Sequence, residues 1–144
     1  MYRVSRLKKE DAPKVWTHWN LNRLVSEDNV RHDIVHFPSS GIRERGWQQD
    51  EAQDTLVAWT RTMIFGWIGN TFTMPQHRGR GLASVATVTL ALQLLQEGLL
   101  AYVAIGDHNT VSIMFHERLG FKRQCAIVTA VLLPAEAAAT DPLG

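Results

Sequence analysis

Cysteine, net charge and long apolar runs are all scarce in this sequence. Cys125 is the one cysteine among 144 residues, so no internal disulfide can form and a reducing compartment is expected. The formal net charge is +1, which gives no reason to expect a general nucleic-acid binder. No apolar run approaches the roughly 20 residues that cross a bilayer, so no membrane partner is expected. The first residues lack the apolar core of a secretory signal, and Glu10 and Asp11 argue against a transit peptide.

The composition is that of an ordinary globular protein, with 45% apolar and 20% charged residues and no internal repeats. We expect a single domain over 1–133 and a flexible tail over 134–144. Hydrophobic periodicity and turn residues predict strands at 2–7, 41–43, 55–62, 64–74, 99–105 and 121–132. Capping residues and apolar spacing predict helices that begin at Asp11 and Ser26, a long helix over 82–97, and a helix that Asn109 caps and Leu119 closes.

Two of these expectations concern packing. In the long helix, Leu82, Val85, Val88, Leu92 and Leu95 recur at helical spacing and are expected to lie across the sheet, with Ala86, Leu90 and Leu94 widening the apolar face. The run 99–105 is apolar without interruption, which is typical of a strand covered on both faces. Glycines at 66 and 69 predict a bulge or the close approach of a ligand in the strand before the long helix.

The stretch 71–83 carries the clearest chemistry, because a strand runs through it into a basic glycine loop that opens the long helix. Gly79 and Gly81 permit unusual backbone dihedrals and close approach of a ligand. Arg78 and Arg80 add charge-assisted donors, and the helix start offers unpaired N–H groups to an anion. The loop is not a phosphate loop of the Walker type, since no Gly-Lys-Ser/Thr follows. A basic surface turn without a ligand is the alternative interpretation.

These residues resemble the GNAT superfamily of acyl-coenzyme A-dependent N-acyltransferases. Residues 78–83, Arg-Gly-Arg-Gly-Leu-Ala, fit its pyrophosphate loop, Gln/Arg-x-x-Gly-x-Gly/Ala. Residues 109–121, from Asn109 to Phe121, look like its second signature helix. Each match alone is of middling specificity, but two in the right order about thirty residues apart are strong together.

Within the superfamily the chain looks most like the catalytic half of the glycine N-acyltransferase family. The markers are His18-Trp19-Asn20, Phe37-Pro38, Val57-Ala58-Trp59 and the run from Thr73 to Arg78, and the likeness covers roughly 16–132. Members of that family carry a further N-terminal domain. The resemblance therefore implies a fragment, an isoform or a compact relative.

The resemblance implies an α/β (α+β) protein of the GNAT fold. Its central sheet would be mixed, mainly antiparallel, flanked by helices, and splayed between the strands before and after the long helix. Pantetheine would lie in that gap against the backbone of Phe72, Thr73 and Met74. The pyrophosphate would be held by Arg78, Gly79, Arg80, Gly81, Leu82 and Ala83, and Asn109 would reach the coenzyme A from the other side. No metal is implied.

Amine acylation by a thioester needs a base for the ammonium and a proton for the departing thiolate. The superfamily pattern usually has a tyrosine as the acid at the position of His116, and histidine could serve as acid or base there, or be a helix residue without chemistry. The base of the glycine N-acyltransferases is a glutamate, and a gap-free count places Trp67 at its position. Trp67, Trp59 and Phe72 could instead wall an acyl pocket or belong to the sheet core.

The sequence leads to three hypotheses for the function. The first is transfer of an acyl group from acyl-coenzyme A to glycine or a similar small amine, with activity in question because of Trp67. The second is an acyl-coenzyme A-binding module that is weakly active or inactive and serves a regulatory or partner-binding role. The third, nucleic-acid binding through Arg78 and Arg80, is disfavoured because the chain lacks a charge excess and a row of exposed aromatics. We expect an intracellular location, which the resemblance implies is mitochondrial and which is otherwise cytoplasmic; the oligomeric state is left open.

Overall fold

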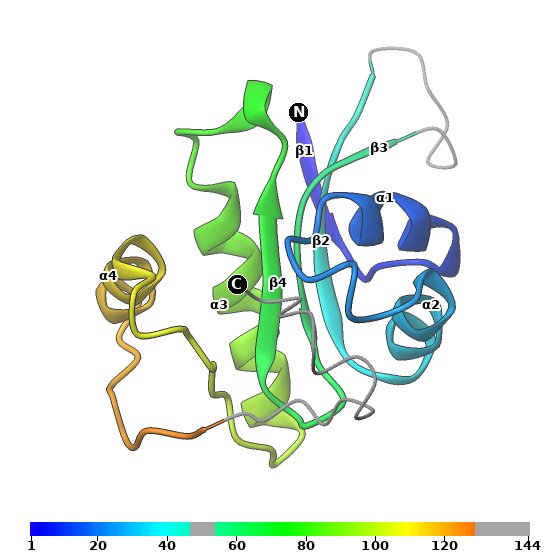
Figure 1. Ribbon diagram of the computed structural model, residues 1–144. Helices are drawn as coiled ribbons and strands as arrows, with labels where there is room; N and C mark the ends of the chain where they lie inside the picture. Colours follow the sequence, from blue (N-terminus) through cyan, green and yellow to red (C-terminus); the bar gives the residue numbers. More distant parts are fainter. Residues whose placement is uncertain (47–53, 129–144) are drawn as a thin grey trace, which may run out of the picture.

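The computed structural model describes residues 1–46 and 54–128, and a four-stranded antiparallel sheet organises its first part (Figure 1). The strands lie in the order β1 (Tyr2–Ser5), β2 (Ser39–Glu44), β3 (Thr55–Thr62) and β4 (Ile68–Thr73). The helices are α1 (Ala12–Thr17), α2 (Glu27–His36), α3 (Leu82–Gln96) and α4 (Thr110–Arg118), with short 3-10 helices η1 (Lys9–Asp11) and η3 (Pro75–His77). A mainly antiparallel sheet flanked by helices was predicted, and the structure confirms it.

Helices α1 and α2 cover one face of the sheet, while α3 crosses the other (Figure 1). Ser26 caps α2 as predicted, because its hydroxyl accepts a hydrogen bond from the Asn29 N–H at 3.2 Å. The core on the α1/α2 face consists of Leu7, Ala12, Val15, Trp19, Val30, Ile34, Leu56 and Trp59. Burial of these side chains holds the two helices against β3.

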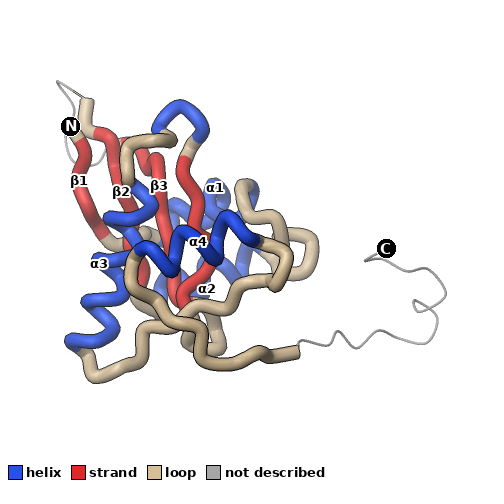
Figure 2. Tube along the Cα trace, turned by 90° about the vertical axis from the view of Figure 1, so that its left-hand side faces the viewer, coloured by secondary structure: helices blue, strands red, loops and turns tan. Residues whose placement is uncertain are grey.

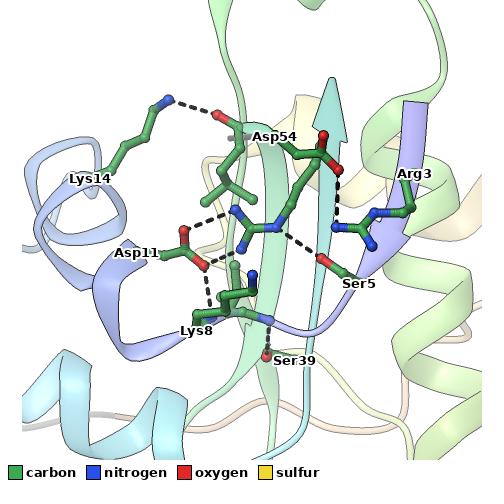
Figure 3. Close-up of polar contacts among 10 residues, drawn as sticks. Arg3, Ser5, Lys8, Asp11, Lys14, Ser39 and Asp54 are labelled. Atoms are coloured by element: carbon green, nitrogen blue, oxygen red, sulfur yellow. Dashed lines mark hydrogen bonds and ion pairs between the residues drawn. The ribbon is translucent and has the colours of Figure 1, made fainter. Parts of the chain in front are cut away.

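Two ion pairs fasten the same helices to the sheet. Arg43 of β2 is 5% exposed and donates two hydrogen bonds to the Asp11 carboxylate (Figure 3). Arg61 of β3 is fully buried, donates to Asp33 of α2 at 3.1 Å, and lies 5.0 Å from the centroid of the Trp19 ring. Burial lowers the pKa of Arg61 although Asp33 opposes the shift. Charges removed from water need such partners, so these pairs specify where α1 and α2 sit.

The face that α3 buries differs from the predicted one. Its buried residues are Leu82, Ala86, Thr87, Leu90 and Leu94. Val85, Val88, Leu92 and Leu95 are instead exposed, by 39% to 56%. The helix is apolar nearly all round, so its own periodicity does not select a face. Contact with β3 and with Ile68 of β4 makes the choice.

The chain after α3 also departs from prediction. Residues 99–105 form no strand, and their one pairing is a parallel bridge between Val103 and Ile68. Leu100 is 77% exposed, so the apolar run is not covered on both faces. Residues 121–128 are likewise without a strand, while 129–132 and the predicted tail lie outside the described residues.

The remaining predicted boundaries shift by a few residues. The strand before the long helix begins at Ile68 rather than at residue 64, because 64–66 form a turn in which Gly66 has φ +87°. In the described ranges 1–46 and 54–128, no helix combines the length and the apolar character that crossing a bilayer requires.

Candidate functional site

The loop between β4 and α3 has the backbone that its glycines predict. Gly79 has φ +75° and Gly81 has φ +73°, a left-handed conformation that costs other L-residues about 1–2 kcal/mol. A Cβ atom at either position would meet no atom within 4 Å. The glycines are therefore needed for the dihedrals, and the space beside the loop is open to a ligand.

The N-terminus of α3 adjoins this open space. Gly81 is the N-cap residue and no side chain caps the helix. The first intrahelical hydrogen bond runs from the Val85 N–H to the Gly81 carbonyl at 3.1 Å, which leaves the N–H groups of Leu82, Ala83 and Ser84 outside the helical ladder. Together with the helix dipole, these N–H groups favour an anion.

Arg78 and Arg80 flank the loop, and each is tied to a neighbour. The Arg78 Nε donates to the Thr73 carbonyl at 3.0 Å, and its guanidinium lies 5.4 Å from the centroid of the Phe72 ring. Arg80 donates to the Tyr2 hydroxyl, which also bonds the His77 Nδ1 at 2.9 Å. A guanidinium has five N–H donors, so both arginines retain donors for an anion.

The register of β4 decides which backbone groups face its outer edge. Met74 donates its N–H to Val57 of β3 at 2.8 Å, and its carbonyl accepts from the His77 N–H. In an antiparallel pair, residues alternate between facing the partner strand with their backbone groups and facing away from it. Phe72, opposite Trp59, and Met74 face β3, so the backbone groups of Thr73, which lies between Phe72 and Met74, point away from β3. Of the three strand residues expected to hold pantetheine, Thr73 is the one whose N–H faces the open edge, while its carbonyl already accepts from the Arg78 Nε.

That outer edge is unpaired over most of its length. The parallel bridge between Ile68 and Val103 includes a hydrogen bond from the Ile68 N–H to the Tyr102 carbonyl at 2.8 Å. Within the described residues, no other pairing joins β4 to the chain that follows α3. The two segments thus meet at the start of β4 and separate toward Met74, which is the predicted splay.

A β-bulge interrupts β4 between Gly69 and Phe72, just before the part of the strand that borders the splay. Trp59 pairs with Phe72 but Arg61 pairs with Gly69, so β4 has one extra residue here. Asn70 takes up the irregularity with φ +53°, an unusual value for a residue other than glycine. Gly69 had indicated a bulge in this strand, and the bulge lies directly after it.

His116 of α4 is buried and has one nitrogen without a partner. Its Nδ1 donates to the Ser112 carbonyl at 2.8 Å, which leaves Nε2 as the unprotonated acceptor. Burial lowers the pKa of His116, so the neutral ring is favoured near pH 7. The rings of Phe115 and Phe121 adjoin it at 4.9 and 5.4 Å. Of the roles considered for this residue, this tautomer fits a base and not an acid.

Asn109 performs the capping role that its position predicts. Its Oδ1 accepts a hydrogen bond from the Ser112 N–H at 3.2 Å, at the start of α4. The side chain is thereby directed to its own helix. Figure 2 views the face of the sheet that α3 covers and draws α4 in front of the strands, so α4 lies on the same side of the sheet as α3.

The aromatic residues divide into two groups. Trp59 is fully buried and stacks on Phe72, with ring centroids 5.2 Å apart. Trp67 lies instead beside Phe65, at 5.2 Å, at the opposite end of β4. His18, at the end of α1, stacks on Phe72 at 4.9 Å. Sequence reasoning gave His18 no role; its signal was its place in the His18-Trp19-Asn20 marker.

Comparison with known proteins identifies a family and a fold for the chain. Residues 41–129 match the sequence model of the family described as FR47-like protein. No curated protein matches the chain. A Drosophila protein of known structure superposes with a TM-score of 0.71 at 20% identity, over 85% of this chain and 40% of that chain.

Two further structures are covered almost completely by this chain. A GCN5-related N-acetyltransferase from Ralstonia eutropha gives a TM-score of 0.67 at 12% identity, over 91% of this chain and 99% of that chain. AAC(6')-Iy, solved with a bisubstrate analogue of coenzyme A, gives 0.65 at 14% identity, over 93% of this chain and 99% of that chain. At these identities the likeness shows the GNAT fold, whereas the chain spans less than half of the Drosophila protein.

Proposed function

The chain belongs to the FR47-like protein family, and we propose that it transfers an acyl group from acyl-coenzyme A to the amino group of a small acceptor. The observation that carries the proposal is one continuous feature of the fold. The unpaired edge of β4 leads directly into the glycine loop and the uncapped N-terminus of α3. A long ligand with amide groups at one end and a pyrophosphate at the other matches this path.

The residues present fit coenzyme A at both ends. The left-handed glycines leave open space beside the loop, where the amides from Gly79 to Ala83 would hold the pyrophosphate with Arg78 and Arg80. The N–H of Thr73 would donate to a pantetheine amide, as a further strand pairs with a sheet edge. The coenzyme would supply the thioester-activated acyl group.

The acceptor class rests on the sequence markers shared with the glycine N-acyltransferases, so we propose glycine or a similar small amine. The structurally similar AAC(6')-Iy is an aminoglycoside N-acetyltransferase solved with coenzyme A. That protein supports the choice of an amine acceptor in general. Acceptors with and without a carboxylate must therefore both be tried.

The test is an assay of thiol release by the purified protein. Short, branched and aromatic acyl-coenzyme A donors are each combined with glycine, other amino acids and aminoglycosides. We expect free coenzyme A with at least one pair, and a calorimetric titration should show binding of the donor alone. Binding without release from any pair would contradict acyl transfer, and absence of binding would contradict the coenzyme A site itself.

Trp67 favours a second candidate function, an acyl-coenzyme A-binding module with weak or no turnover. Indole takes up no proton, and the ring lies beside Phe65 at the far end of β4 from the glycine loop. If loss of a glutamate base explains low activity, Trp67→Glu should raise thiol release while Trp67→Phe should not. No gain from Trp67→Glu in a protein that binds the donor well would show the lost-base explanation to be wrong.

A further inference from the structure

His18 is placed by tertiary contacts on the strand that leads to the glycine loop. It ends α1, where its N–H donates to the Lys14 carbonyl at 3.2 Å. Its imidazole stacks on Phe72 of β4, with centroids 4.9 Å apart and planes 25° apart, and tilts against Trp59 at 6.1 Å. Phe72 immediately precedes Thr73, whose backbone faces the open edge, so the imidazole lies close to the proposed path of the thioester.

Contacts with Phe72 and Trp59 orient the imidazole ring of His18 but form no hydrogen bond to its nitrogens. The residue is half-buried, and among the described residues neither ring nitrogen takes part in a hydrogen bond or an ion pair. Two other partly or fully buried histidines differ: His77 bonds Tyr2 and faces Glu44, and His116 bonds its own helix. A stacked imidazole with free nitrogens is suited to meet an incoming amine.

Two carboxylates between the sheet and helices α1 and α2 are already engaged in ion pairs. Asp11 is bound to Arg43 and Asp33 to Arg61, so neither carboxylate is free to take a proton. The charged groups that adjoin the stack are Arg78, over the Phe72 ring, and Arg61, two positions after Trp59. His116 has a free Nε2, but its described ring contacts are with Phe115 and Phe121 and not with β4.

We propose that His18 is the general base of the acyl transfer, in place of the glutamate that Trp67 replaces; this inference rests on the proposed function. The amine nitrogen forms a bond to the thioester carbonyl carbon and the carbon–sulfur bond breaks. The proton leaving the amine passes to the free nitrogen of His18, and the imidazolium returns it to the thiolate. Amide and free thiol are the products, with no oxidant or reductant required.

The test compares His18→Phe, which keeps a stacked ring without nitrogen, with His18→Gln and with His116→Phe. We expect both His18 variants to lower kcat by roughly 10²–10⁴-fold while the affinity for acyl-coenzyme A by calorimetry stays within about twofold. In a profile of kcat against pH, the wild type should show a decrease toward acid pH, here called the acid limb. This acid limb should be absent in His18→Phe. His116→Phe separates the two histidines: an acid limb that persists in this variant supports His18, and its loss would assign the base to His116.

A second readout does not depend on turnover. In the ¹⁵N-labelled protein, the imidazole resonances of His18, assigned by their loss in His18→Phe, should shift on addition of acyl-coenzyme A. Wild-type kcat in His18→Phe would overturn the inference, as would an acid limb that disappears only in His116→Phe. If the wild type releases no coenzyme A, the proposed acyl transfer fails. Unshifted His18 resonances in a protein that binds the donor overturn the placement of His18 separately.

Discussion

The two sides of the proposed coenzyme A site are built very differently. On the β4 side, the sheet rests on buried residues such as Trp59, and ion pairs tie the helices to the strands. On the α4 side, residues 99–118 pair with the sheet through a single bridge and pack against it mainly at Ile68, and Leu100 and Val111 are 77% and 79% exposed. One wall of the site is therefore preformed, whereas few described contacts hold the opposite wall.

The largest loss of stability is expected on the well-packed β4 side, from substitution of Arg43. Arg43→Met removes one partner of a buried pair and leaves the Asp11 carboxylate without its cation, which should lower the free energy of unfolding by about 3–5 kcal/mol. Urea denaturation measures this. The matched control is Asp107→Asn, because the pair of Asp107 with Arg123 is exposed and should contribute less than about 1 kcal/mol. Equal losses from the two substitutions would contradict the contrast.

A smaller effect is expected on the β4 side, in the glycine loop at Gly81. Gly81→Ala forces a left-handed backbone on an L-residue, which costs about 1–2 kcal/mol, and it adds a methyl group beside the open space. We expect the dissociation constant for acyl-coenzyme A to rise about tenfold in calorimetric titration. Gly98→Ala is the control, since Gly98 has φ +76° but follows the other end of α3. Similar affinities in both variants would argue against the glycine loop as the pyrophosphate site.

The N-caps of α2 and α4 allow a direct comparison of stability between the two sides, because each consists of one side-chain hydrogen bond. Ser26→Ala and Asn109→Ala each delete one cap hydrogen bond, worth about 1 kcal/mol in a helix that belongs to the cooperative core. We expect that full loss in global stability only for Ser26→Ala. For Asn109→Ala, faster amide exchange confined to 110–118 should exceed any change in the urea midpoint. Global loss of the same size from Asn109→Ala would show that α4 unfolds together with the sheet.

The smallest effect is expected in the pH dependence contributed by His116. Its pKa is lowered in the folded protein by burial, so the unfolded chain binds more protons below the ordinary histidine pKa. Stability should therefore decrease as pH falls from about 7 toward 5, the range below the ordinary pKa of about 6.5. His116→Phe should reduce that decrease in urea denaturation at the two pH values. An unchanged pH dependence would mean that the ring is protonated as easily in the folded state as in the unfolded chain.

Local signals in the sequence predicted local structure well. Ser26 and Asn109 cap the helices where a short polar side chain stands before an apolar-periodic run, and β3 has the predicted bounds of 55–62. These features depend on residues within a few positions of one another. The predicted strand at 99–105 failed because a strand needs a neighbour along its length, and β4 provides one only at Ile68.

The candidate site shows the same division. The motif at 78–83 predicted both the bend of the loop and the open helix start, since glycine dihedrals and unpaired N–H groups are properties of short segments. The assignment of strand backbone groups needed the register, because the pairing of Met74 with Val57 is what turns Thr73 toward the edge. The splay was implied by the family resemblance, and the divergence of the chain after Val103 confirms it.

The sequence by itself determined the elements whose causes are local: the left-handed glycines at 79 and 81, the caps at Ser26 and Asn109, and the order of strand, loop and helix. Tertiary structure alone decided which face of α3 is buried, since that helix is apolar nearly all round and only the sheet selects a side. It also brought His18 onto Phe72. Contacts between residues far apart in the chain depend on how whole layers pack, and no short segment specifies that packing.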